Sequence, residues 1–272
     1  MKLSNEYLKL FEEQGFVVIN NYYPEEKRQA ISQAIRRTLL PWEDLKHNPP
    51  KDRLQIDDFP YEDMFFNDLI IDMDLINFVQ RALDSEDIHF RYAHNWVRYP
   101  NPGGPESYER RDIDLHLDNG NNSILPPCDD IRYGQISTWY FPEEVTDEQA
   151  PMLVVPKAYG KDSSKKVLLT VPAGTLMIFN TYLWHSATLY RSKDKQRYSV
   201  TRIYGRADHY WEGVRTYTNL ARDENFRKFI GSLTAKEREL FRFPPAGHSY
   251  YNSKTLKSLE KQYPGWNAES EY

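Results

Sequence analysis

Two histidines and one aspartate are spaced so that they could hold a metal ion. His116 and Asp118 lie two residues apart in Asp-Leu-His-Leu-Asp, and residues with this spacing point to the same face of a strand. His185 follows the strand-like run 174–180 and comes directly after Trp184. Two imidazoles and one carboxylate form the facial triad of non-haem Fe(II) oxygenases, which leaves three positions open on the metal. A His-x-Asp pair alone also fits an ordinary histidine beside a solvated aspartate.

A possible anion site follows on the next strand-like run. Arg197 lies twelve residues after His185, and Ser199 is expected on the same strand face as Arg197. A guanidinium beside a hydroxyl is suited to a buried carboxylate ligand. Arg202 lies on the same run and is the alternative for this role. An arginine that only pairs with a surface carboxylate is the plainer interpretation of either residue.

The composition excludes several other classes of function. Lys+Arg 35 against Asp+Glu 40 gives a net charge of −5, so no positive excess is available to bind a nucleic-acid backbone. No apolar run approaches the ~18 residues of a membrane span, and the N-terminus lacks the order of a secretory signal. We therefore expect a cytoplasmic protein with no nucleic-acid or membrane partner. Because Cys128 is the only cysteine, a metal would need histidine and carboxylate ligands.

Helical patterns lie at both ends of the chain, and short strand patterns lie between them. Apolar spacing predicts helices over residues 4–14, 24–39, 68–83, 223–230, 234–241 and 253–262. Strands are predicted over residues 16–19, 89–99, 133–141, 152–155, 166–171, 175–180 and 196–204. Residues 42–63 are interpreted as a long surface excursion that covers a pocket. Short strands at regular spacing indicate a sandwich or barrel.

The chain shows no repeat, low-complexity tract or linker-like shift in composition, so we expect a single domain over residues 1–272. That domain would consist of a helical N-terminal part (1–87), a β core (88–208) and a helical C-terminal tail (209–272).

The order of these motifs resembles the phytanoyl-CoA dioxygenase (PhyH)-like family of Fe(II)/2-oxoglutarate-dependent oxygenases. The motifs that carry the resemblance are Gly-Phe-Val-Val-Ile at 15–19, His116-x-Asp118, Trp184-His185 and Arg197, together with a segment at 236–248 that is similar to one common in bacterial members. The resemblance implies a mainly β fold with flanking helices, built on a double-stranded β-helix (a cupin-like jelly roll). Two features depart from the family: the turn at 152–160 is altered, and Arg197 comes one residue later than usual.

The resemblance also implies roles for the motif residues. His116, Asp118 and His185 would ligate Fe(II), and Arg197 with Ser199 would bind the distal carboxylate of 2-oxoglutarate, with O2 as the remaining reactant. Family members that halogenate lack the carboxylate at the position of Asp118. Its presence here implies hydroxylation or a related oxidation, with release of succinate and CO2.

Further pocket residues follow from loose alignment and strand alternation. His94 or Trp96, together with Trp139, is expected near 2-oxoglutarate. The residues expected near the substrate are Asn95, Arg98, Asn119, Asn121, Tyr210 and Trp211. Residues 91–99 equally fit an amphipathic outer strand, and a tryptophan such as Trp139 equally fits a core position.

We therefore expect an oxygenase that acts on a small polar metabolite or natural product, such as an amino-acid-like or mycosporine-like compound. An acyl-CoA hydroxylase of the same family is an alternative, although it would need a Lys/Arg patch for the CoA phosphates. Two further alternatives are a non-catalytic jelly roll that binds a small ligand, and a cupin-like Mn or Zn hydrolase or isomerase.

Overall fold

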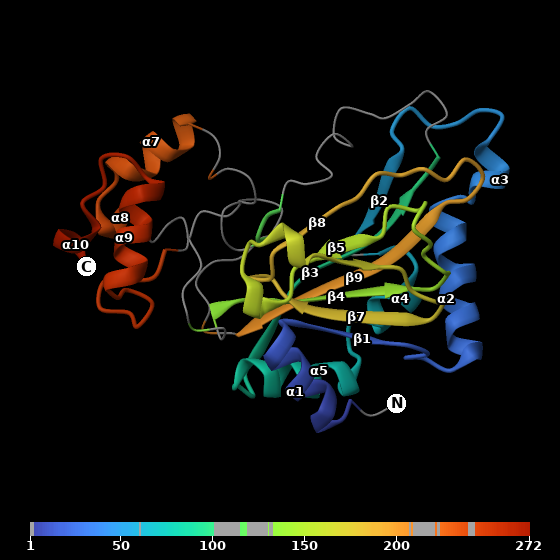
Figure 1. The fold of residues 1–272 in the computed structure, drawn as a ribbon, viewed down its shortest axis with the longest axis horizontal. Coiled ribbons are helices and arrows are strands. Elements are labelled where there is room, and N and C mark those ends of the chain that lie inside the picture. Colours follow the sequence, from blue (N-terminus) through green and yellow to red (C-terminus); the bar gives the residue numbers. More distant parts are fainter. Residues whose placement is uncertain are drawn as a thin grey trace.

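Two antiparallel sheets form the centre of the protein (Figure 1). The computed structural model describes residues 3–59, 61–100, 115–118, 130, 133–206, 208, 221, 224–238 and 243–272. The larger sheet runs in the order β1 (Phe16–Ile19), β7 (Thr175–Asn180), β4 (Ile136–Phe141), β9 (Arg197–Arg206), β3 (Ile88–Arg98) and β2 (Leu54–Asp58). The smaller sheet runs in the order β6 (Val167–Leu169), β5 (Met152–Val154) and β8 (His185–Ser186).

Helices cover one face of the larger sheet. These are α1 (Asn5–Gln14), α2 (Glu25–Thr38) and α5 (Met73–Leu83), and the short helices α3 (Trp42–Leu45) and α4 (Met64–Asp68) lie between α2 and α5 in the chain. Their buried apolar side chains form one continuous core with the sheet. Figure 1 shows α1 and α5 below the sheet and α2 along its right side. The predicted combination of a β core with flanking helices is therefore present.

The strands of the larger sheet alternate between two environments. In β9, Tyr198, Val200 and Tyr204 belong to the core beneath the helices. In β7, Met177 and Phe179 point the other way, into a second apolar cluster that includes residues of β5. Because successive side chains of a strand point to opposite faces, every second residue of the larger sheet faces the space between the two sheets.

Helix boundaries follow local chemistry. Gly15 ends α1 in the left-handed conformation at φ 80°, which a residue without a Cβ adopts at little cost. Asp72 caps α5 by accepting a hydrogen bond from the Leu75 amide, and Asn252 forms a capping box at the start of α9 (Ser253–Gln262) with Thr255.

Residues 42–63 differ from the predicted surface excursion, because they contain α3 and β2. β2 pairs antiparallel with β3 and forms one edge of the larger sheet. Leu54 and Ile56 are the only apolar residues of this strand, and their alternation with polar residues is too short to distinguish a strand from a loop. Residues 42–63 therefore contribute an edge strand to the larger sheet.

The C-terminal helices gather around their own aromatic cluster at one end of the molecule (Figure 1). They are α7 (Glu224–Ser232), α8 (Ala235–Arg238), α9 and α10 (Ala268–Glu271). The guanidinium of Arg238 is fully buried there, 3.5 Å from the centre of the Trp266 ring. Within the described ranges, no helix combines the length and apolar character needed to cross a bilayer.

Candidate metal centre

A short backbone pairing brings the two sequence-predicted histidines together. His116 and His185 form an antiparallel bridge, with N to O distances of 2.9 and 3.1 Å. The amide of Asp118 donates to the carbonyl of Thr181 at 3.1 Å, which fixes the far end of the His-x-Asp segment. His116 and Asp118 are half-buried, whereas the leucines that precede each of them are buried. The alternation predicted from their spacing is therefore observed.

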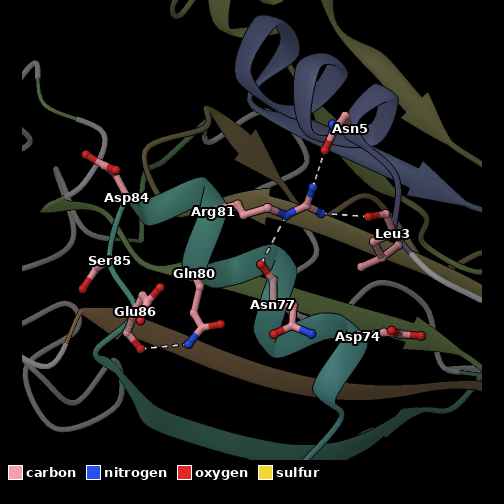
Figure 2. Close-up of a pocket in the computed structure, with 9 residues that line it drawn as sticks. All are labelled: Leu3, Asn5, Asp74, Asn77, Gln80, Arg81, Asp84, Ser85 and Glu86. Carbon is pink, nitrogen blue, oxygen red and sulfur yellow. Dashed lines mark hydrogen bonds between the residues drawn. The ribbon is translucent and has the colours of Figure 1, made fainter.

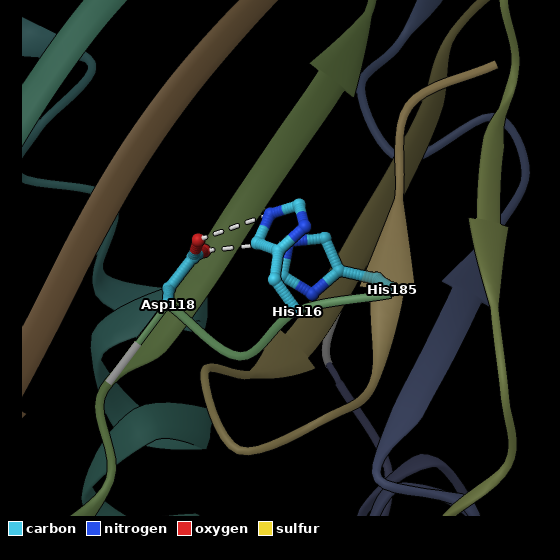
Figure 3. Close-up of side chains that lie close together, drawn as sticks. All are labelled: His116, Asp118 and His185. Carbon is cyan, nitrogen blue, oxygen red and sulfur yellow. Dashed lines mark ion pairs between the residues drawn. The ribbon is translucent and has the colours of Figure 1, made fainter. Parts of the chain in front are cut away.

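The three side chains converge (Figure 3). His116 Nε2 lies 3.7 Å from one oxygen of Asp118, and His185 Nε2 lies 3.6 Å from the other. One ligand atom from each of the three lies within 4.8 Å of the others. Ligands at right angles and ~2.1 Å from a single metal are separated by about 3.0 Å. Small side-chain adjustments therefore suffice for all three to share one ion.

His185 is held in the tautomer that a metal ligand needs. Its Nδ1 lies 2.9 Å from the carbonyl oxygen of Leu183, and since a carbonyl only accepts, Nδ1 carries the proton. The lone pair is then on Nε2, which faces Asp118. Burial lowers the pKa of His185, opposed by the nearby Asp118 carboxylate and reinforced by His116. The imidazole is thus neutral at pH 7 and able to bind a metal.

The donor set favours a borderline divalent metal. Two imidazole nitrogens and one carboxylate oxygen suit Fe(II), and a set of only three protein ligands leaves positions open for other molecules. Among the described residues, no other group of three histidine, cysteine or acidic side chains has this geometry.

A cavity of about 260 Å³ opens beside the triad. It is lined by Leu54, Trp96, Arg98, His116, Asp118, Trp139, Ala150, Met152, His185, Ser186, Ala187, Thr188 and Arg197. The two tryptophans pack edge to face with ring centres 4.8 Å apart. The cavity therefore combines the candidate metal ligands, an aromatic wall and two cationic side chains.

Arg197 reaches this cavity from β9. Its side chain is almost fully buried, and one terminal nitrogen donates to the carbonyl of Ala150. Among the described residues, its Nε has no hydrogen-bond partner, and neither has Oγ of the buried Ser199 two residues along the same face. Burial and, secondarily, the neighbouring Arg98 lower the pKa of Arg197. A buried guanidinium with an unused donor is suited to binding an anion.

Arg202 lies on the opposite face of β9 and does not line the cavity. Its guanidinium is 3.2 Å from the hydroxyl of Tyr23, and that hydroxyl donates to Asp72 at 2.6 Å. Tyr22 donates to the same carboxylate at 3.0 Å. The two arginines that the sequence left as alternatives thus have different surroundings: Arg197 is in the cavity, and Arg202 is in the core beneath the helices.

The other predicted pocket residues divide into three groups. Trp139 and Arg98 line the cavity. His94 lies on the same face of β3 as Trp96, with ring centres 5.2 Å apart, but it does not line the cavity. Asn95 lies on the other face of β3, where its amide nitrogen is 3.3 Å from Asp57, so it is turned away from the cavity.

Four predicted substrate residues, Asn119, Asn121, Tyr210 and Trp211, lie outside the described residues. The sequence interpretation also missed six lining residues: Leu54, Ala150, Met152, Ser186, Ala187 and Thr188. Leu54 belongs to the edge strand that was interpreted as an excursion, and Met152 and Ser186 lie in the short strands β5 and β8. The other three lie in connections outside regular strands, for which the sequence has no periodic signal.

A larger hollow of about 640 Å³ lies elsewhere, between the start of the chain and α5 (Figure 2). Arg81 is central to it and donates to the side chain of Asn5 at 2.6 Å and to the carbonyl of Leu3 at 2.7 Å. These bonds attach the N-terminal segment to α5. We assign the site to the smaller cavity because it contains the triad.

The sequence matches one known family. Residues 11–198 match the model of the phytanoyl-CoA dioxygenase (PhyH) family, and this range includes the triad and Arg197. No curated protein matches the sequence.

Many solved structures share the fold, and three examples follow. HygX from Streptomyces hygroscopicus, with nickel and 2-oxoglutarate bound, is 15% identical with a TM-score of 0.57, over 78% of this chain and 91% of HygX. EvdO2 from Micromonospora carbonacea var. aurantiaca is 14% identical with a TM-score of 0.57, over 80% of this chain and 98% of EvdO2. SnoK, a non-heme alpha ketoglutarate dependent carbocyclase from nogalamycin biosynthesis, is 17% identical with a TM-score of 0.57, over 82% of this chain and 89% of SnoK. The predicted fold class, a double-stranded β-helix with flanking helices, is confirmed.

Proposed function

The chain belongs to the phytanoyl-CoA dioxygenase (PhyH) family, and from this membership we propose that it is an Fe(II)- and 2-oxoglutarate-dependent dioxygenase that oxidises a small polar molecule. The observation that carries the proposal is the convergence of His116, Asp118 and His185 within 4.8 Å beside a cavity that also contains Arg197.

In this proposal the triad holds Fe(II). The fit is supported by the donor set and by the neutral, Nδ1-protonated state of His185. When bound, the iron activates O2 together with 2-oxoglutarate, which is converted to succinate and CO2. The residues of the chain fix the geometry of the metal and keep three coordination positions open.

Arg197 and Ser199 are proposed to bind the distal carboxylate of 2-oxoglutarate. Both lie on the inward face of β9, and each has a buried polar atom for which the described part of the chain supplies no hydrogen-bond partner. A carboxylate accepts several hydrogen bonds, so it would satisfy both atoms at once. Trp139 and Trp96 would shield this end of the cavity from water.

The substrate is proposed to be small and polar. The wall of the cavity mixes apolar groups with hydroxyl, imidazole and guanidinium groups. HygX, which shares the fold, has been crystallised with hygromycin B. An amino-acid-like compound or another natural product fits these features, and the carboxylate of Asp118 favours hydroxylation.

Succinate formation tests the proposal. The full chain would be incubated with Fe(II), 2-oxoglutarate, O2 and a panel of small polar candidates, and succinate and oxidised products would be measured by mass spectrometry. We expect succinate from the native protein, none from His185→Ala, and an unchanged yield from His47→Ala, which replaces an exposed histidine. Equal succinate from the native protein and His185→Ala would refute the proposal.

A further inference from the structure

Two arginines face each other across neighbouring strands of the cavity wall. Arg98 of β3 and Arg197 of β9 are direct partners in the antiparallel register, and both line the cavity. Their exposed fractions are only 6% and 4%. Directly opposed residues have Cβ atoms about 4.5–5.5 Å apart, and like charges in this arrangement destabilise a sheet.

The groups around the two guanidiniums are carbonyls and aromatic rings. Arg98 lies 3.4 Å from the carbonyl of Thr188 and 5.6 Å from the centre of the Tyr190 ring. Arg197 donates to the carbonyl of Ala150 and lies 5.7 Å from the centre of the Trp96 ring. These contacts orient the two side chains.

The carboxylates of the cavity do not neutralise Arg197. Among the described lining residues the only acidic one is Asp118, which faces the two histidines, and within the described part of the chain Arg197 forms no ion pair. Arg98 lowers the pKa of Arg197, as expected for two nearby cations. An anion between the two guanidiniums would remove this repulsion.

We propose that Arg98 and Arg197 form a two-guanidinium clamp that holds one carboxylate, the distal carboxylate of 2-oxoglutarate. The clamp rests on the proposed function and adds a second cation to it. Two guanidiniums supply enough donors for all lone-pair positions of a carboxylate, with Ser199 Oγ as a further donor. Arg98 is then a cosubstrate residue, whereas the sequence had suggested a contact with the substrate.

With the carboxylate bound, each guanidinium is attracted to the anion, and this attraction offsets the repulsion between the two arginines. Binding of 2-oxoglutarate is therefore expected to raise the melting temperature of the native protein by more than binding of 2-oxobutyrate, which lacks the distal carboxylate.

Binding measurements without turnover test the clamp. Under anaerobic conditions with Fe(II), the affinities of the full chain for 2-oxoglutarate and 2-oxobutyrate would be measured by calorimetry, and melting temperatures would be measured with and without each acid. For Arg98→Gln we expect about 10- to 100-fold weaker binding of 2-oxoglutarate, since a hydrogen bond to a charged group is lost. Binding of 2-oxobutyrate should change little.

Two further variants complete the test. Arg98→Lys keeps the charge but not the planar fork, so an intermediate affinity is expected. Arg37→Gln, which replaces an exposed arginine paired with Asp63, should behave like the native protein. If Arg98 is only structural, Arg98→Gln will melt lower and lose affinity for both acids equally, which overturns the clamp.

The clamp is also overturned if Arg98→Gln binds 2-oxoglutarate with the same affinity as the native protein. If product formation by this variant falls at the same time, Arg98 contacts the substrate instead. Failure of the native protein to bind 2-oxoglutarate in the presence of Fe(II) would refute the proposed function itself. The two failures are therefore distinguishable.

Discussion

Replacing Arg202 or Arg197 with methionine should affect different properties, although the two arginines lie on the same strand. Arg202 is fully buried beneath the helices, and its guanidinium contacts the Tyr23 hydroxyl at 3.2 Å. That hydroxyl donates to Asp72, which also caps α5. Arg202→Met removes a cation from this network and leaves Lys27 as the remaining positive charge near the Asp72 carboxylate among the described residues.

We expect Arg202→Met to lower the free energy of unfolding by about 2–4 kcal/mol, the range for losing one member of a buried, partly charged network. That corresponds to roughly 5–15 °C in melting temperature for a chain of this size. Affinity for 2-oxoglutarate, measured below the melting transition, should stay within about threefold of the native value, because Arg202 does not line the cavity.

Arg197→Met should show the reverse pattern. It removes a buried cation that is repelled by Arg98 and loses one hydrogen bond to a carbonyl, so the free energy of unfolding should change by no more than about 1 kcal/mol. Affinity for 2-oxoglutarate should fall by about 100-fold or more. Chemical unfolding and calorimetry would measure both quantities. Native stability with lost cosubstrate binding in Arg202→Met would refute the reasoning.

Three other changes have defined outcomes. Asp118→Ala should weaken Fe(II) binding at neutral pH, measured as the anaerobic Kd for Fe(II), because it removes the only oxygen ligand of the triad; an unchanged Kd would contradict the assignment. Gly15→Ala should lower the free energy of unfolding by about 1–2 kcal/mol, since φ is 80° and a Cβ would come 2.9 Å from a leucine side chain. Gly247 also has a positive φ, 84°, but has open space around it, so Gly247→Ala should lower the free energy of unfolding by less than Gly15→Ala, with both measured by urea titration. An equal loss in the two variants would show that the close contact at Gly15 is relieved. Asn95→Ala should lower stability by about 1 kcal/mol and leave 2-oxoglutarate affinity unchanged, because its side chain faces away from the cavity; a loss of affinity would contradict that placement.

The sequence predicted the elements that have strong periodicity. The apolar stripe of α2 and the alternation of β9 follow from residue spacing alone, and so does the shared face of His116 and Asp118. The edge strand β2 was missed because its residues are mostly polar and half-exposed. Its pairing with β3 is a long-range contact that no local pattern reveals.

The choice between Arg197 and Arg202 shows where spacing stops being informative. The two residues are five apart, so alternation places them on opposite faces of one strand. Which face meets the cavity depends on where the helices pack, and that is a property of the whole fold. Asn95 is a similar case, since its neighbours in β3 at 94 and 96 face inward while its own side chain meets Asp57.

Anaerobic absorption spectroscopy tests the central claim most directly. Fe(II) and 2-oxoglutarate added together to the native protein should produce the weak visible charge-transfer band of an iron-bound 2-oxo acid. The band should persist in His47→Ala and be lost in His116→Ala. If the native protein gives no band, with iron and 2-oxoglutarate both unbound in the same sample, the triad does not hold the proposed metal centre.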